Sequence, residues 1–173
     1  MLIKKIKKRG QVWIETVIYT LIGVIIISLA LAFIRPKIEE IQDRGVIEQT
    51  SNMIDYIDEK ISEMKVSGNK RIVDLEIKKG VLTIGSVSDS IKFEIESSYM
   101  FSQPNVNIEL QNGIIALTER KGSEYLITLT KDYNSQYNIT YLDKDEDKSL
   151  TSSSLPYKLV IYKEINNLNF EII

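Results

Sequence analysis

The feature that most constrains this chain is an apolar run of 19 residues, Thr16 to Ile34, that contains no formal charge. As an α-helix at about 1.5 Å per residue, it spans roughly 28 Å, close to the hydrocarbon thickness of a bilayer. A buried core helix could have this composition, but the first ten residues also contain five cations: Lys4, Lys5, Lys7, Lys8 and Arg9. Cations before an apolar helix hold its N-terminus in the cytoplasm. We therefore expect one membrane-spanning helix, with the rest of the chain outside the cell.

The apolar run differs from an ordinary cleaved secretory signal. It is longer than a usual signal core, and the nearest small-residue cleavage site, Ala30-Leu31-Ala32, is followed by bulky residues and Arg35. Helical spacing also continues beyond the run. The residues that continue it are Ile38, Ile41, Ile47, Ile54, Ile57, Ile61 and Met64.

We therefore expect one long helix from Gln11 to Val66. Residues 11–35 would be apolar on all sides and form the transmembrane part, and residues 36–66 would be amphipathic. Pro36 is expected to kink this helix, because proline removes a backbone donor and clashes with the preceding turn. Ser67-Gly68-Asn69 is a helix-ending sequence.

The composition excludes several classes of chemistry. Cysteine and histidine are both absent, which removes disulfides, the usual zinc ligands and the usual acid–base group at neutral pH. Taking the five N-terminal cations from the 22 basic residues leaves 17, against 24 acidic residues. Such an acidic body does not suit nucleic acid. No nucleophile–base pair or glycine-rich phosphate loop is visible, so we predict no enzyme activity and no cofactor.

The junction before the apolar run contains a short motif. It reads Lys7-Lys8-Arg9-Gly10-Gln11-Val12-Trp13-Ile14-Glu15, a basic leader that ends in glycine, with a carboxylate five residues later. This resembles the class III signal peptide of archaeal type IV pilin-like proteins. The resemblance implies that a prepilin peptidase cuts between Gly10 and Gln11 and removes residues 1–10. Trp13 departs from the family, in which a small residue is common at that position.

Glu15 has two interpretations. It can be a helix-start carboxylate favoured by the helix dipole. Alternatively, it needs a cationic partner, because an unpaired carboxylate in an apolar core costs several kcal/mol. Cleavage would create such a partner, the α-amine of Gln11. The family resemblance implies that this amine meets Glu15 of a neighbouring subunit and sets the register of a filament.

From about Arg71 the apolar period changes from 3.6 to 2, which predicts β-strands. Turns are expected at Lys79-Gly80, Asn112-Gly113 and Lys121-Gly122, and Asn-Gly is a strong hairpin signal. The alternating apolar positions are Val73, Leu75, Ile77, Ile91, Phe93, Ile95, Tyr125, Ile127, Leu129, Tyr137, Ile139, Tyr141, Tyr157, Leu159, Ile161, Leu168, Phe170 and Ile172. We expect eight or nine short strands over residues 67–173, forming an antiparallel β-sandwich or small barrel packed on the amphipathic helix. The fold class is therefore α+β, and a long helix followed by an antiparallel β head resembles the plan of pilins.

Two features of this head are candidate sites. Asn138-Ile139-Thr140 is an N-glycosylation acceptor, and the alternation places Asn138 on the outward face of its strand. Asp143, Asp145 and Asp147 alternate as in the first half of a calcium-binding EF-hand loop. Lys148 replaces the required glycine, however, and Ser154 replaces the bidentate glutamate, so a solvated loop is the simpler interpretation and we predict no metal site.

The resemblance implies a subunit, a major or minor pilin, of an archaeal type IV pilus-like surface filament with a role such as adhesion. Its partners would be other pilin-like subunits, the prepilin peptidase, an assembly ATPase and a membrane platform protein. Membrane lipid would surround the helix before assembly. An archaellin is a variant of this hypothesis. The alternatives are a permanently anchored single-pass surface protein whose β-sandwich head binds a partner, and a membrane-anchored enzyme, which we rank last.

Overall fold

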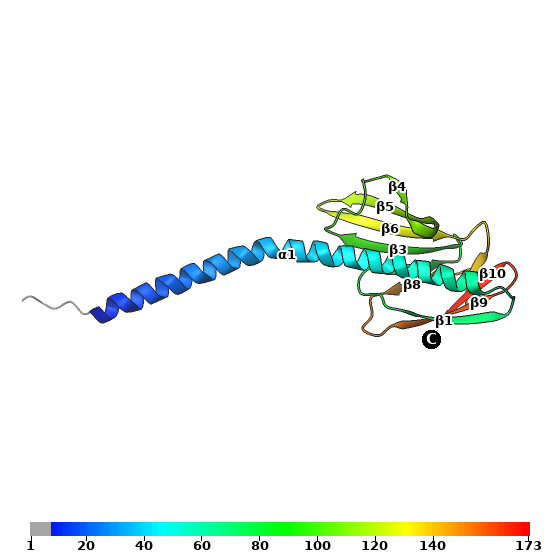
Figure 1. The fold of residues 1–173 in the computed structure, drawn as a ribbon, viewed down its shortest axis with the longest axis horizontal. Coiled ribbons are helices and arrows are strands. Elements are labelled where there is room, and N and C mark those ends of the chain that lie inside the picture. Colours follow the sequence, from blue (N-terminus) through cyan, green and yellow to red (C-terminus); the bar gives the residue numbers. More distant parts are fainter. Residues whose placement is uncertain (1–7) are drawn as a thin grey trace, which may run out of the picture. The chain divides into compact units, whose positions relative to one another are not determined.

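The computed structural model describes residues 8–173, with side chains from Val12 onward, and shows one long helix followed by ten strands (Figure 1). The chain divides into two compact units, one ending at Glu39 and one running from Glu40 to Ile173. The elements are α1 (Lys8–Glu63), β1 (Asn69–Leu75), β2 (Val81–Gly85), β3 (Ser90–Ser97), β4 (Asn107–Glu109), the 3₁₀ turn η1 (Gln111–Gly113), β5 (Ile114–Lys121), β6 (Glu124–Asp132), β7 (Asn138–Tyr141), β8 (Lys148–Thr151), β9 (Tyr157–Lys163) and β10 (Asn167–Ile172). The fold class is α+β, as the sequence predicts.

The helix α1 belongs to both units and is helical throughout, including at Pro36. Its bounds lie within three residues of the expected Gln11–Val66. After it, Gly68 adopts a positive φ of 85° and donates its N–H to the carbonyl of Lys163 at 2.8 Å. The Ser67-Gly68-Asn69 sequence therefore turns the chain from the helix into the first strand.

The second half of α1 forms one wall of the core of the head. Its buried residues follow each other at alternating spacings of four and three, which keeps them on one stripe. They are Asp43, Ile47, Thr50, Ile54, Ile57 and Ile61, and Met64, directly after the helix, continues the stripe. Ile38 and Ile41, which the sequence pattern includes in this stripe, are instead 46% and 70% exposed. The helical spacing of apolar residues continues from Ile38 onward, but the buried part of the stripe begins only at Asp43, four residues before Ile47.

The strands form two sheets. One has four strands in the order β1-β9-β10-β7, and the other has six in the order β4-β5-β6-β3-β2-β8. Buried residues from both sheets and from α1 form one apolar cluster. Figure 1 shows the second half of α1 running between β3 of the larger sheet and β1 of the smaller one. The sheets and the helix therefore share a single core.

One strand pair departs from the expected antiparallel pattern. β7 and β10 pair in parallel, from Asn167 opposite Asn138 to Phe170 opposite Tyr141. Parallel neighbours need a long connection. Here that connection contains β8, which joins the other sheet, and β9. All other pairs are antiparallel.

The predicted turns hold two of the hairpins. Gly122 has a φ of 67° in the tight β5–β6 turn, where Lys121 lies opposite Glu124. At the β4–β5 turn both Asn112 and Gly113 have positive φ, as the Asn-Gly signal requires. The loop is one residue longer than a two-residue turn, because the N–H of Leu110 bonds to the carbonyl of Ile114 across η1. Lys79-Gly80, in contrast, connects the two sheets rather than a hairpin.

Candidate functional site

The apolar half of α1 is exposed on all sides. Every large apolar side chain from Val12 to Ile34 is between 45% and 77% exposed. By length and composition this helix could cross a membrane, and none of its most apolar window is buried inside the structure. An exposed apolar surface of this extent needs lipid or protein around it. The helix is therefore the most prominent candidate for membrane insertion or assembly.

The polar side chains of this segment suit an apolar environment. The hydroxyl of Thr16 donates to the carbonyl of Val12 at 2.9 Å, and that of Ser28 donates to Val24 at 2.7 Å. Thr20 donates to Val17 at 2.9 Å. A hydroxyl bonded to its own helix adds little cost when the helix enters lipid or a helix bundle.

A shallow groove lies on the surface of the same helix. It has a volume of about 260 Å³ and is lined by Ser28, Leu31, Ala32 and Arg35. Ser28 and Ala32 are small residues four positions apart, so they share a face of the helix. Small residues at this spacing allow another helix backbone to approach closely.

The residues of the predicted cleavage motif fall at the start of α1. Met1–Lys7, most of the basic leader, lie outside the described residues. Gly10 and Gln11 are in the first turns of the helix. Glu15 is exposed, and its position four residues after Gln11 places both on one side of the helix. The backbone geometry thus puts the two proposed register residues on a common face.

Asp43 joins the helix to the head and was not singled out by the sequence. Its side chain is 5% exposed and accepts from Lys79 Nζ at 2.5 Å. It also accepts the backbone N–H of Ser98 at 3.1 Å. One buried carboxylate thus ties α1 to the β1–β2 turn and to the end of β3. The signal was present, since Asp43 is an acidic residue in register with the isoleucine stripe.

Further contacts hold the C-terminal half of α1. Lys131 of β6 pairs with Asp58 at 3.2 Å, and both side chains are largely buried. Lys163 donates to the carbonyl of Ile61 at 3.3 Å and lies 4.8 Å from the ring centroid of Tyr137. A cation at a helix C-terminus is favourable because it meets the negative end of the helix dipole. The helix is therefore held by charge as well as by apolar packing.

Tyr133, just after β6, is 1% exposed, and its hydroxyl is the one buried side-chain polar atom of the described residues without a hydrogen-bond partner. Burial raises the pKa of this hydroxyl, and the negative charge of Asp58 raises it further. The phenol therefore stays neutral in the folded protein.

The glycosylation candidate lies at the surface. Asn138 is the first residue of β7 and is exposed, as the alternation predicts. Its side-chain amide donates to Asn167 Oδ1 at 3.2 Å. The next position with the same outward orientation, Thr140, is only 7% exposed.

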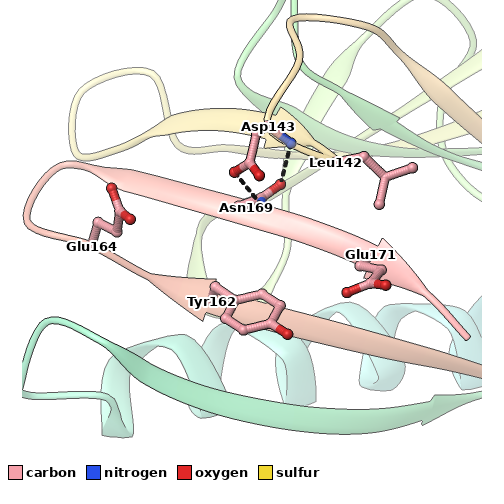
Figure 2. Close-up of a pocket in the computed structure, with 6 residues that line it drawn as sticks. All are labelled: Leu142, Asp143, Tyr162, Glu164, Asn169 and Glu171. Carbon is pink, nitrogen blue, oxygen red and sulfur yellow. Dashed lines mark hydrogen bonds between the residues drawn. The ribbon is translucent and has the colours of Figure 1, made fainter.

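Two of the three alternating aspartates, Asp143 and Asp147, bond to different partners. Figure 2 shows Asp143 beside Asn169, whose side chain accepts from the Asp143 N–H at 3.0 Å and donates to its carboxylate at 2.6 Å. Asp147 accepts the N–H of Val87 at 3.1 Å instead. Within residues 8–173, no group of three acidic side chains is arranged to hold a metal ion.

Asp143 also lines an open pocket of about 360 Å³ on the outer face of the smaller sheet (Figure 2). Its other lining residues are Leu142, Tyr162, Glu164, Asn169 and Glu171. Three of the lining residues carry carboxylates, and one carries an aromatic ring.

The chain matches no protein-family model, no curated protein and no solved structure. Its architecture, a long apolar N-terminal helix followed by β-sheets, is nevertheless pilin-like.

Proposed function

We propose that this protein is a structural subunit of an archaeal type IV pilus-like surface filament, and not an enzyme. The single observation that carries the proposal is the difference in burial between the two halves of α1. Its first half exposes apolar side chains in every direction, whereas its second half is built into the core of a folded head. A continuous helix of this kind can pass from lipid into a bundle of like helices while the head stays folded outside.

The proposed route begins with a single-pass membrane precursor whose N-terminus is cytoplasmic. A prepilin peptidase would cut after Gly10, and an assembly ATPase with a membrane platform protein would extract the processed chain. In the filament, the apolar helices would exchange lipid for each other, so close packing at positions such as Ser28 and Ala32 must offset the loss of lipid contacts. The charge pair between the Gln11 amine and Glu15 would set the register.

The test is the N-terminal residue of the protein recovered from the cell surface. We expect mass spectrometry to show a terminus at Gln11 in sheared filaments. Gly10→Val should block the cut, because the branched side chain has no room where a peptidase accepts glycine, and should leave unprocessed chain in the membrane. Gly23→Val is the matched control, since a side chain at Gly23 meets no atom within 4 Å. A surface protein that keeps residues 1–10 would contradict the proposal and favour the permanently anchored surface protein.

A further inference from the structure

The two edges of the four-stranded sheet differ. At the β7 edge the outward backbone groups are already bonded: the N–H of Ile139 donates to the Asp89 carboxylate at 2.7 Å, and that of Tyr141 donates to the carbonyl of Lys144 at 2.9 Å. Proteins commonly block edges in such ways, because an open edge invites pairing with another chain. The opposite edge is β1, the longer of the two edge strands, with seven residues.

Hydrogen bonds beyond β9 show which backbone groups of β1 face outward. The backbone N–H of Glu164 donates to the carbonyl of Asn167, and the N–H of Ile173 donates to the carbonyl of Lys158. The even-numbered residues of β9 therefore point their backbone groups at β10, and its odd-numbered residues point at β1. Because Asn69 lies opposite Lys163, the odd residues of β1 receive those bonds.

It follows that Lys70, Ile72 and Asp74 direct their N–H and C=O groups away from β9, at the open edge. The side chain of Arg71 donates to the carbonyl of Lys70 at 3.1 Å, which agrees with an outward carbonyl. Within residues 8–173, no strand other than β9 pairs with β1.

The side chains of the same three residues lie on the outer face of the sheet and form the ends of cross-strand rows. Lys70 lies 4.8 Å from the ring centroid of Tyr162, and Lys158 pairs with Asp74 at 3.1 Å. Between these rows Ile72 lies opposite Val160. Val160 is fully buried, yet Ile72 is 55% exposed, so an apolar row ends uncovered at the edge.

We propose that the β1 edge pairs with β1 of a second copy of this chain, antiparallel and related by a two-fold axis at Ile72. In that register Ile72 faces its own counterpart, and Lys70 faces Asp74 of the other copy at both ends. Each charged residue then lies between an existing partner on its own sheet and an opposite charge across the new pair. The backbone groups of Lys70, Ile72 and Asp74 are those that a two-fold hydrogen-bonded pairing uses.

A second copy fits this edge better than an unrelated strand because the edge is complementary to itself. A parallel pairing with the same alignment would place Lys70 against Lys70 and Asp74 against Asp74, which is destabilising. Seven residues bury little surface compared with the roughly 1,200–2,000 Å² of a stable complex. The pairing is therefore weak for a single head and becomes effective where many heads are held close together. The inference does not depend on cleavage at Gly10.

The test uses the absence of cysteine from the chain. Full-length Ile72→Cys protein is placed in lipid nanodiscs at one copy per disc, so that dimers form only through the heads, and is oxidised. Opposed residues in this register have Cα atoms about 5.5 Å apart, within disulfide range. We expect a disulfide-linked dimer on non-reducing gels. Ile115→Cys, at a β5 position that is 42% exposed, is the matched control and should form dimer far more slowly.

The register is tested with two further variants. Lys70→Cys alone and Asp74→Cys alone should not form dimers, since like positions lie about 13 Å apart along the strands. A mixture of the two should form the mixed dimer. Ile72→Cys that reacts no faster than Ile115→Cys would overturn the pairing, and fast self-dimers of Lys70→Cys would overturn the antiparallel register.

Charge reversal gives an independent readout. In the Ile72→Cys background, Asp74→Lys places lysine opposite Lys70 twice per dimer and should slow cross-linking about tenfold. Adding Lys70→Asp restores opposite charges and should recover the rate. The exchanged side chains are exposed, and circular dichroism checks that the fold is kept. Equal rates in all three backgrounds would overturn the proposed charge pairing.

Discussion

At the scale of single residues, Asp43 shows how one carboxylate can decide where a long helix joins its head. It occupies the first buried position of the α1 stripe and is bonded to Lys79 and to the Ser98 N–H. A buried acceptor with two donors is stable where it is, and removing it takes the acceptor away from both Lys79 and the Ser98 N–H. The residue therefore fixes the start of the packed half of α1.

We expect Asp43→Ala to lower the free energy of unfolding of a 36–173 fragment by about 2–3 kcal/mol. Breaking a buried pair costs about 3–5 kcal/mol, and the value is lower here because Lys79 is half exposed and can return to water. Glu48→Ala is the control. Its pair with Arg44 is exposed on both sides and screened by water, so its loss should cost far less than the loss of Asp43. Urea unfolding measures both, and equal costs would contradict the anchoring role of Asp43.

Tyr133→Phe should stabilise the head by about 1 kcal/mol, since it removes a buried hydroxyl that has no partner. The pH dependence of the folding stability is a second test of the burial of this hydroxyl. The folded-state pKa is raised, so above pH 10 the unfolded state loses a proton that the folded state keeps, and stability falls as the pH rises. The wild-type protein should thus lose about 1.4 kcal/mol per pH unit above pH 10 from this residue, and Tyr133→Phe should not. Parallel stability curves for the two proteins above pH 10 would rule this out.

At the scale of elements, the part of α1 from Asp43 onward belongs to the core of the head. Ile47, Ile54, Ile57, Ile61 and Met64 are at most 1% exposed. Burying each such side chain contributes about 1.5–3 kcal/mol. Together they contribute on the order of 10 kcal/mol, which is comparable to the whole stability of a domain.

A fragment of residues 67–173 should therefore not unfold cooperatively, whereas residues 36–173 should give a single sharp transition. Calorimetry of the two fragments tests this, with tyrosine fluorescence as a second probe of the 67–173 fragment. If both melt at the same temperature, the helix contributes nothing to the core.

The sequence predicts the helix and the strands better than it predicts the contacts between them. Period-2 alternation identifies buried residues such as Phe93 and Ile127 correctly, because one face of each strand meets the core. It does not show which strands are neighbours, so it does not predict the parallel β7–β10 pair. An apolar pattern also does not show where the surface that covers it ends. Ile41 therefore fits the apolar stripe of the helix but is exposed.

The sequence likewise predicts one part of the candidate site and not the other. The exposed apolar helix follows from composition, since 19 uncharged residues cannot be covered by a small head. The Asp43 contacts depend on Lys79 and Ser98, which lie 36 and 55 residues away in sequence. Contacts of that separation are set by tertiary packing, so local patterns predict the residue at most and not its partners.

At the scale of the whole molecule, Glu15→Gln separates assembly from anchoring. If Glu15 pairs with the Gln11 amine of a neighbour, the variant buries that amine without a counter-ion, at a cost on the order of 3–5 kcal/mol for each subunit. Filament yield should collapse. Membrane insertion should persist, because a neutral side chain enters lipid more easily than a charged one.

We expect Glu15→Gln protein to accumulate as processed, membrane-held monomer, because the bond after Gly10 is unchanged. Electron microscopy of sheared filaments and mass spectrometry of membrane protein give the two readouts. Normal filament numbers from Glu15→Gln cells would remove the register role and leave Glu15 as a helix-start carboxylate.

The open β1 edge has a consequence for direction. A two-fold axis that lies across the direction of a filament reverses one chain relative to the other, whereas the subunits of one helical filament all point the same way. If the axis through Ile72 has that orientation in the proposed filament, neighbours within a single filament do not pair their β1 strands with each other. Two filaments that run in opposite directions can form that pairing repeatedly along their length. The seven-residue edge of one small sheet would then link fibres that run in opposite directions.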